Sequence, residues 1–233
     1  MRIALIGYGE VGRILAEDLR ERAHVLAAYD TRLAGDAGQA MREHAQLCGV
    51  TMAADHAEAV RGAELVISAV TASQAVAVAE AVAPGLTGGA FVLDLNSASP
   101  GAKVHACAVV HAALGRYVEG AVMTSVPPHR IKVPLLLGGP DAGALAPLLD
   151  ELGFAARIAS PALGVASATK MCRSVMIKGL EAMVIESFTA ARHYGVEDAV
   201  IASLAETFPG IDWERQAAYF FQRVMEHGRR RSE

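Results

Sequence analysis

The chain has 233 residues, of which 53% are hydrophobic and 5% aromatic, so it can bury a sizeable core and is not expected to be disordered. Its formal net charge of -4 gives no electrostatic basis for binding nucleic acid, and the basic run Arg229–Arg231 is expected to be a solvated helix end. The cysteines and histidines show no metal-ligand spacing, so we expect free thiols and no metal site.

The apolar stretches do not predict a membrane segment or a leader. The longest uncharged run, Leu65–Ala79, is short and contains Ser, Thr and Gln. Residues Met1–Ile6 have the pattern of a strand rather than that of a signal peptide. We therefore expect a cytoplasmic protein with no membrane partner.

Short β-rich runs alternate with helical patterns up to about residue 160. The expected strands are Arg2–Ile6, Val25–Tyr29, Leu65–Val70, Phe91–Leu95, Tyr117–Ala121, Pro134–Leu137 and Phe154–Ile158. The expected helices between them are Val11–Arg22, Ser73–Ala83, Ser99–Ala113 and Asp141–Leu152. This rhythm predicts an α/β domain over residues 1–162, with a doubly wound, mainly parallel sheet of the Rossmann type.

The pattern changes after Pro161. One unusually long helix is expected from Gly164 to Tyr194, with Gly195 as its C-terminal cap. Further helices are expected at Val196–Glu206 and Trp213–Arg230. Residues 163–233 are therefore predicted to form a small all-α domain.

Residues 7–12 place a Gly-x-Gly-x-x-Gly loop between the first strand and the first helix. The first glycine permits the tight turn, the second lets amides approach a pyrophosphate, and the third allows close helix–strand packing. The helix N-terminus offers unpaired N–H groups to the phosphates. The alternative is a glycine-rich turn with no ligand. The residues expected to bind a dinucleotide here are Gly7, Tyr8, Gly9, Glu10, Val11 and Gly12.

Asp30 ends the second expected strand, where a carboxylate can accept hydrogen bonds from both ribose hydroxyls. Such a carboxylate repels a 2′-phosphate and so favours NAD, whereas Arg32 attracts one. Both NAD and NADP therefore stay open, with NAD favoured. Val70 and Thr71, at the end of the third expected strand, complete the predicted cofactor site together with Asn96.

The segment Asp94–Pro100 follows the carboxyl end of another strand, where open α/β sheets bind ligands. Asn96 and Ser97 are suited there to bind a hydroxyl or a carboxylate. The alternative is an Asx-type turn that caps the helix starting at Ser99.

Lys170 lies in an otherwise apolar stretch of the long helix, and Arg173 and Ser174 follow at spacings that place all three on one face. Two cations on one face suggest an anionic ligand. The nearby Arg173 and partial burial are expected to lower the pKa of Lys170, which lets the amine exchange a proton near neutral pH. The alternative is a solvated surface lysine.

These segments resemble, in order and spacing, the β-hydroxyacid dehydrogenases, the group that contains 3-hydroxyisobutyrate dehydrogenase and 6-phosphogluconate dehydrogenase. Asp94–Pro100 resembles the family's Asp-x-Ser-Thr-x-x-Pro substrate motif, and Glu119–Ser125 resembles its Asp-Ala-Pro-Val-Ser-Gly-Gly loop. Gly164–Ser174 is similar to the helix that carries the catalytic lysine. The resemblance implies that Lys170 is catalytic. The implied substrate-binding residues are Asn96, Ser97, Thr124, Ser125, Arg173 and Ser174.

The activity implied by this resemblance is hydride transfer between a nicotinamide cofactor and the carbinol carbon of a small hydroxy acid, with Lys170 as general acid and base. Arg173 or Asn96 would hold a substrate carboxylate. The sequence departs from the family where Arg173-Ser174 replaces Asn-Asn and Met123-Thr124-Ser125 replaces Ser-Gly-Gly, so the substrate contacts are altered. The alternatives are an imine or ketone reductase, and a catalytically silent nucleotide-binding protein.

The region after Lys170 is shorter than the helical domain of that family, so the chain is either truncated or naturally short. The long helix 164–194 carries more apolar surface than a lone helix can expose. We therefore expect a homodimer formed through the helical domain, as the resemblance also implies.

Overall fold

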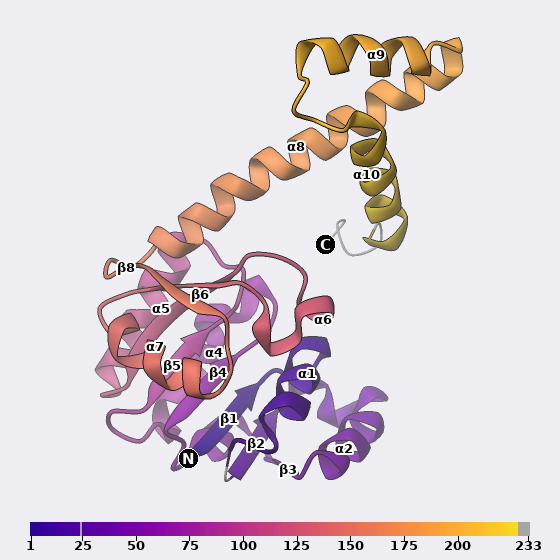
Figure 1. Ribbon diagram of the computed structural model, residues 1–233. Coiled ribbons are helices and arrows are strands. Elements are labelled where there is room, and N and C mark those ends of the chain that lie inside the picture. The colour runs from indigo at the N-terminus through magenta and orange to yellow at the C-terminus, as the bar shows by residue number, and fades with distance from the viewer. Residues whose placement is uncertain (24, 228–233) are drawn as a thin grey trace. The chain divides into compact units, whose positions relative to one another are not determined.

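The computed structural model describes residues 1–23 and 25–227 (Figure 1). Its internal contacts divide the chain into two compact units, Met1–Met171 and a second unit that begins at Cys172. The expected boundary lies at residues 162 and 163, whereas the contacts assign the first two turns of the long helix to the first unit.

One eight-stranded sheet forms the centre of the first unit, with the order β3-β2-β1-β4-β5-β6-β7-β8. All neighbouring strands are parallel except β6 and β7, which are antiparallel. The strands are β1 (Arg2–Ile6), β2 (Val25–Tyr29), β3 (Val50–Met52), β4 (Leu65–Ser68), β5 (Phe91–Asp94), β6 (Arg116–Val122), β7 (Leu135–Gly138) and β8 (Ala156–Ser160). The sheet order reverses direction at β1 and β4, and such a switch point opens a crevice at the carboxyl ends of the strands.

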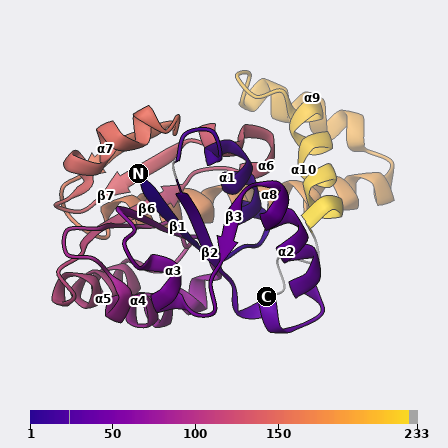
Figure 2. The same ribbon diagram turned by 90° about the horizontal axis from the view of Figure 1, so that it is seen from below.

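Helices cover both faces of this sheet (Figure 2). The helices of the first unit are α1 (Glu10–Leu19), α2 (Ala37–Leu47), α3 (His56–Val60), α4 (Ala75–Val82), α5 (Pro100–Ala112), α6 (Val126–His129) and α7 (Ala142–Glu151). Short 3-10 helices occur at Thr31–Ala34, Ala72–Gln74, Ala83–Gly85 and Arg130–Lys132. Helices α1, α2 and α7 contribute to one buried apolar cluster, and α3, α4 and α5 contribute to a second one. The expected Rossmann-type architecture is confirmed.

The sequence pattern does not predict α2 or β3, which the structure places between β2 and β4. Helix α2 buries only Gly38, Met41 and Ala45, so its apolar face is narrow. Strand β3 has three residues and is an edge strand that pairs with β2 alone. It therefore lacks the continuous apolar run that marks the central strands.

The second unit is helical. Helix α8 (Val165–Tyr194) enters it, and α9 (Glu197–Thr207) and α10 (Trp213–His227) follow. Its small core contains Phe188, Trp213 and Phe220. The expected helix end at Arg229–Arg231 lies outside the described residues. Within residues 1–23 and 25–227, no helix combines the length and the apolar character that crossing a membrane requires.

Candidate functional site

The glycine loop after β1 adopts a conformation that side chains cannot follow. Gly7 has a φ of +94°, and a Cβ there would overlap the carbonyl oxygen of Ala69. A Cβ on Gly12 would overlap the carbonyl oxygen of Gly7, because α1 starts directly against the strand end. Helix α1 begins after Gly9, which has no side chain to cap it, so the first amides of the helix face the site.

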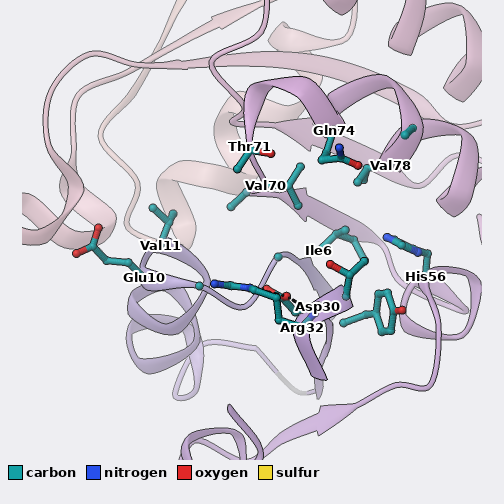
Figure 3. A pocket seen from close by; sticks show the side chains of 16 residues that line it. Ile6, Glu10, Val11, Asp30, Arg32, His56, Val70, Thr71, Gln74 and Val78 are labelled. Carbon is teal, nitrogen blue, oxygen red and sulfur yellow. Dashed lines mark hydrogen bonds and ion pairs between the residues drawn. The ribbon is translucent and has the colours of Figure 1, made fainter. Parts of the chain in front are cut away.

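A cavity of about 480 Å³ opens above this loop, between the ends of β1, β2 and β4 (Figure 3). The predicted cofactor residues that line it are Gly7, Gly9, Glu10, Val11, Asp30, Arg32, Val70 and Thr71. Tyr8 is fully buried instead, and its hydroxyl lies 3.1 Å from Nδ1 of His44. The Tyr8 side chain therefore supports the loop from behind, while its backbone N–H donates to Asp30 at 2.9 Å.

The Asp30 carboxylate at the end of β2 accepts four hydrogen bonds, two on each oxygen. Oδ2 accepts from the Tyr8 N–H and from the outer guanidinium nitrogen of Arg32, and Oδ1 accepts from the backbone N–H and Nε of Arg32 (Figure 3). Burial opposes ionisation of Asp30, but the hydrogen bonds from Arg32 and Tyr8 outweigh it and hold the pKa of Asp30 below its usual value. Arg32 has a side chain that is 58% exposed and lies close to Gly9. The site therefore presents an exposed guanidinium that is paired with the carboxylate, whereas the sequence names both residues without showing that they meet.

Tyr29, His56 and Gln74 also line the cavity, and the loop motif gives no signal for them. The rings of Tyr29 and His56 meet edge to face, with centroids 4.5 Å apart. Burial lowers the pKa of His56, against a smaller opposing effect of Asp55, which favours the neutral imidazole. The cavity is therefore bordered here by two packed, uncharged rings, which offer apolar surface to a planar base.

Asn96 holds together the loops that follow β4 and β5. Its Oδ1 accepts from the Val70 N–H at 2.6 Å, and its Nδ2 donates to Ser68 at 2.9 Å. The residue is 3% exposed. Both polar atoms of the amide are thus engaged within the protein, so in this structure Asn96 does not present its side chain to a substrate. The cap of α5 comes instead from Ser99, whose hydroxyl accepts from the Ala102 N–H.

A buried ion pair between Lys103 on α5 and Asp94 holds the end of β5 in place. Lys103 is 1% exposed, lies 3.0 Å from Oδ1 of Asp94 and donates to the Asp94 carbonyl at 2.8 Å. The Tyr117 hydroxyl donates to Oδ2 of Asp94 at 2.7 Å. Burial lowers the pKa of Lys103, and the Asp94 charge opposes this. The turn that carries Asn96 and Ser97 is therefore anchored by charges withdrawn from water.

We expect Tyr117→Phe to lower the free energy of unfolding by about 1.5–3 kcal/mol, because it leaves one oxygen of a buried carboxylate without its donor. Urea denaturation followed by circular dichroism measures this change. Tyr219→Phe is the matched control, since that half-exposed hydroxyl is bonded at the surface to Arg223. Equal losses in the two variants would contradict a buried network at Asp94.

Lys170 reaches the same turn from the first unit's part of α8. Its Nζ donates to the Ser97 hydroxyl at 2.6 Å, across 73 positions of the sequence. The structure thus brings the predicted lysine into contact with one of the predicted polar residues. Through Asn96 and Val70, this contact connects with the lining of the cavity.

The remaining predicted substrate residues are placed differently. Thr124 and Ser125 are exposed in the turn between β6 and α6. The segment after this turn is attached to α1, because Arg130 binds Glu17 and Asp18 at 2.6 and 2.7 Å. Arg173 and Ser174 belong to the second unit, so the structure does not relate them to the cavity.

The glycine loop, the switch point and the cavity above them define a dinucleotide-binding protein. Residues 2–151 match the family model described as the NAD binding domain of 6-phosphogluconate dehydrogenase. Residues 191–233 match a model described as a domain of unknown function (DUF1932). The chain therefore belongs to the β-hydroxyacid dehydrogenase and 6-phosphogluconate dehydrogenase-like family, and the expectation from the motifs is confirmed. The cofactor class of the cavity is a nicotinamide dinucleotide.

Solved structures agree with this assignment. A conserved hypothetical protein from Sinorhizobium meliloti 1021 is 41% identical, with a TM-score of 0.84 over 99% of this chain and 78% of that one. A conserved protein of unknown function, described as structurally similar to 3-hydroxyacid dehydrogenases, is 30% identical, with a TM-score of 0.81 over 99% of this chain and 85% of that one. A 3-hydroxyisobutyrate dehydrogenase from Mycobacterium tuberculosis shares the fold at 18% identity, with a TM-score of 0.76 over 91% of this chain and 72% of that one.

Proposed function

We propose that the chain is an NAD(P)-dependent oxidoreductase that transfers a hydride between the nicotinamide and the carbinol carbon of a small hydroxy acid. The observation that carries the proposal is the 2.6 Å hydrogen bond between Lys170 and Ser97. It sets the Lys170 amine at the carboxyl edge of the sheet, beside the loops that line the dinucleotide cavity.

The residues of the cavity fit the cofactor. The close approach of backbone at Gly7 and Gly12 leaves room for a pyrophosphate but not for side chains, and the amides of α1 point to it. Asp30 and Arg32 lie where the adenosine ribose would be held. When bound, the nicotinamide supplies the hydride acceptor or donor.

Lys170 performs the proton transfer in this proposal. In the direction of alcohol oxidation, the neutral amine accepts the proton of the substrate hydroxyl. In the direction of carbonyl reduction, the ammonium returns that proton to the developing alkoxide. Ser97 holds the amine in place by accepting its hydrogen bond, and its own hydroxyl proton is directed elsewhere, toward a substrate oxygen.

We further propose that the cofactor is NADP rather than NAD. All acceptor positions of Asp30 are occupied, so the ribose hydroxyls of NAD must displace Arg32 from a two-point ion pair. A 2′-phosphate leaves that pair intact and adds a second anion to the exposed guanidinium. The Asp30–Arg32 pair thus supports the phosphorylated cofactor.

A panel of small 2- and 3-hydroxy acids, assayed with NAD and with NADP, tests the proposed activity. We expect substrate-dependent reduction of the nicotinamide, measured by its absorbance, with one or more anionic members of the panel. Reduction of cyclic imines without oxidation of any hydroxy acid would instead identify an imine reductase. Cofactor binding with no turnover in either panel would identify a silent nucleotide-binding protein.

We also propose a homodimer formed through the helical unit. Helix α8 exposes large apolar side chains in that unit, at Val175, Met176 and Met183, with exposed fractions of 69%, 72% and 63%. Such a row of side chains is unusual on the free surface of a monomer.

Light scattering is expected to give about twice the chain mass of 24.3 kDa for the wild type. Met176→Lys is expected to shift the mass toward that of one chain, because it places a charge in the apolar row. Leu47→Lys, at an exposed position on α2, is the control and should leave the mass unchanged. A wild-type monomer over the whole concentration range would contradict the proposal.

A further inference from the structure

Glu119 is a buried carboxylate that points at the start of helix α8. It lies on β6 and is 0% exposed. Its Oε1 accepts from the Ala166 N–H at 3.0 Å, and its Oε2 accepts from the Ser167 hydroxyl at 2.9 Å. Burying a carboxylate is unfavourable unless hydrogen bonds compensate, and these two bonds both come from the first turn of α8. The helix dipole at that end also favours a negative charge.

The surroundings of this carboxylate are shaped to receive it. A Cβ on Gly138 of the neighbouring strand β7 would overlap Oε1 of Glu119, so glycine leaves the space that the side chain fills. The Ser167 hydroxyl shares its one proton with the Gly164 carbonyl oxygen, which lies 3.2 Å away, and Gly164 has a φ of +85°. Ala166 packs on Ala121 and Leu136, so the first turn of α8 is held by polar and apolar contacts together.

Ala166 and Ser167 are buried, whereas Val165 and Thr169 on either side are exposed. The first turn of the helix is therefore packed and hydrogen-bonded on the side that faces Glu119. Residues four apart in a helix lie on the same face, so the position of Ala166 determines where Lys170 emerges one turn later. Lys170 emerges 2.6 Å from the Ser97 hydroxyl.

We propose that Glu119 is a positioning residue for Lys170: its carboxylate fixes the rotation and the axial position of the first turn of α8, and thereby holds the amine at Ser97. The catalytic consequence rests on the proposed function, whereas the structural consequence does not.

Glu119→Met tests the proposal, because methionine fills a similar volume and removes both hydrogen bonds. Hydrogen exchange of the peptide that covers residues 164–171 is expected to rise about tenfold or more, as bonds to a charged acceptor are lost. Acetylation of Lys170 by acetic anhydride, followed by mass spectrometry, is expected to become faster. Glu119→Gln should restore most of the wild-type behaviour, since its amide oxygen still accepts from Ala166.

Kinetics provide the second measurement. In Glu119→Met, kcat is expected to fall about a hundredfold, because a small displacement of a reacting group is sufficient for such a loss. The Kd for the cofactor should stay unchanged, since Glu119 does not line the cavity. Leu145→Ala is the matched control for lost stability, because this fully buried side chain lies on α7 and packs in an apolar cluster that contains no residue of α8.

The outcomes separate the two proposals. Wild-type exchange and wild-type Lys170 acetylation in Glu119→Met overturn the positioning role, as do equal changes in Leu145→Ala. If even the wild type turns over no substrate, the proposed function fails, while exchange and acetylation still decide the role of Glu119. If Glu119→Met does not fold, Ser167→Ala removes one of the two bonds. A smaller rise in exchange over the same peptide then supports the proposal, and no rise overturns it.

Discussion

Replacing Lys170 with alanine is expected to lower kcat by about 10²–10⁴-fold, the usual loss when a general acid or base is removed. The reason lies in the placement of the amine on Ser97, where a substrate hydroxyl next to the nicotinamide would meet it. The cavity residues that bind the cofactor do not include Lys170, so the Kd for the dinucleotide should change little. Stopped-flow absorbance of the reduced nicotinamide measures the first quantity, and fluorescence titration measures the second.

Lys178→Ala is the matched control for this prediction, because Lys178 is an exposed lysine on the same helix. It should retain wild-type kcat. Ser97→Ala is expected to give an intermediate loss, since the amine remains but its hydrogen-bond acceptor is gone. A loss below about tenfold in Lys170→Ala would contradict an acid–base role.

The sequence predicts best those elements whose buried residues form a continuous or clearly periodic apolar pattern. Strands β1 and β2 begin and end at the expected residues, because central parallel strands are continuous apolar runs between polar breaks. Helix α8 starts within one residue of its expected start, since Gly164 breaks the preceding segment. Helix α2 and strand β3 are not predicted, because each is only partly buried and leaves a weak apolar period.

The candidate site shows a different limit. The resemblance assigns Ser97 and Lys170 to one substrate site, and the structure brings these two side chains into contact. The resemblance does not predict where a side chain points. Tyr8 points behind the loop and Asn96 points between two loops, although both belong to motifs from which the sequence predicts ligand contacts. Contacts between segments remote in sequence, such as the one from Glu119 on β6 to the start of helix α8, leave no local pattern at all.

Arg32 belongs to a second part of the site, the one on which the sequence leaves the choice between NAD and NADP open. Asp30 alone favours NAD, and the proximity of an arginine in sequence does not show whether the two side chains meet. In the structure Arg32 binds both oxygens of Asp30, at 3.0 and 2.8 Å. The pair lowers the pKa of Asp30 and raises that of Arg32, so both groups remain charged at neutral pH. A ligand therefore meets the ion pair and not a single free charge.

We therefore expect Arg32→Ala to reverse the cofactor preference. Affinity for NADP should fall by about 10- to 100-fold, the value of one or two charge-assisted hydrogen bonds to the 2′-phosphate. Affinity for NAD should rise, because the Asp30 carboxylate regains acceptor positions for the ribose hydroxyls while the Tyr8 N–H still orients it. The Kd values for NADPH and NADH, measured by fluorescence titration, give the ratio directly.

Thr31→Ala is the control, since Thr31 lies between the two residues and lines the same cavity without joining the ion pair. Its ratio of Kd values should equal that of the wild type. Raising the salt concentration should weaken NADPH binding in the wild type more than in Arg32→Ala, because only the wild type offers an exposed cation to the phosphate. An unchanged ratio in Arg32→Ala would mean that Arg32 leaves Asp30 when NAD binds. The ion pair would then exist only in the free site, and the Asp30 carboxylate would accept hydrogen bonds from the ribose hydroxyls, as expected from Asp30 in the sequence.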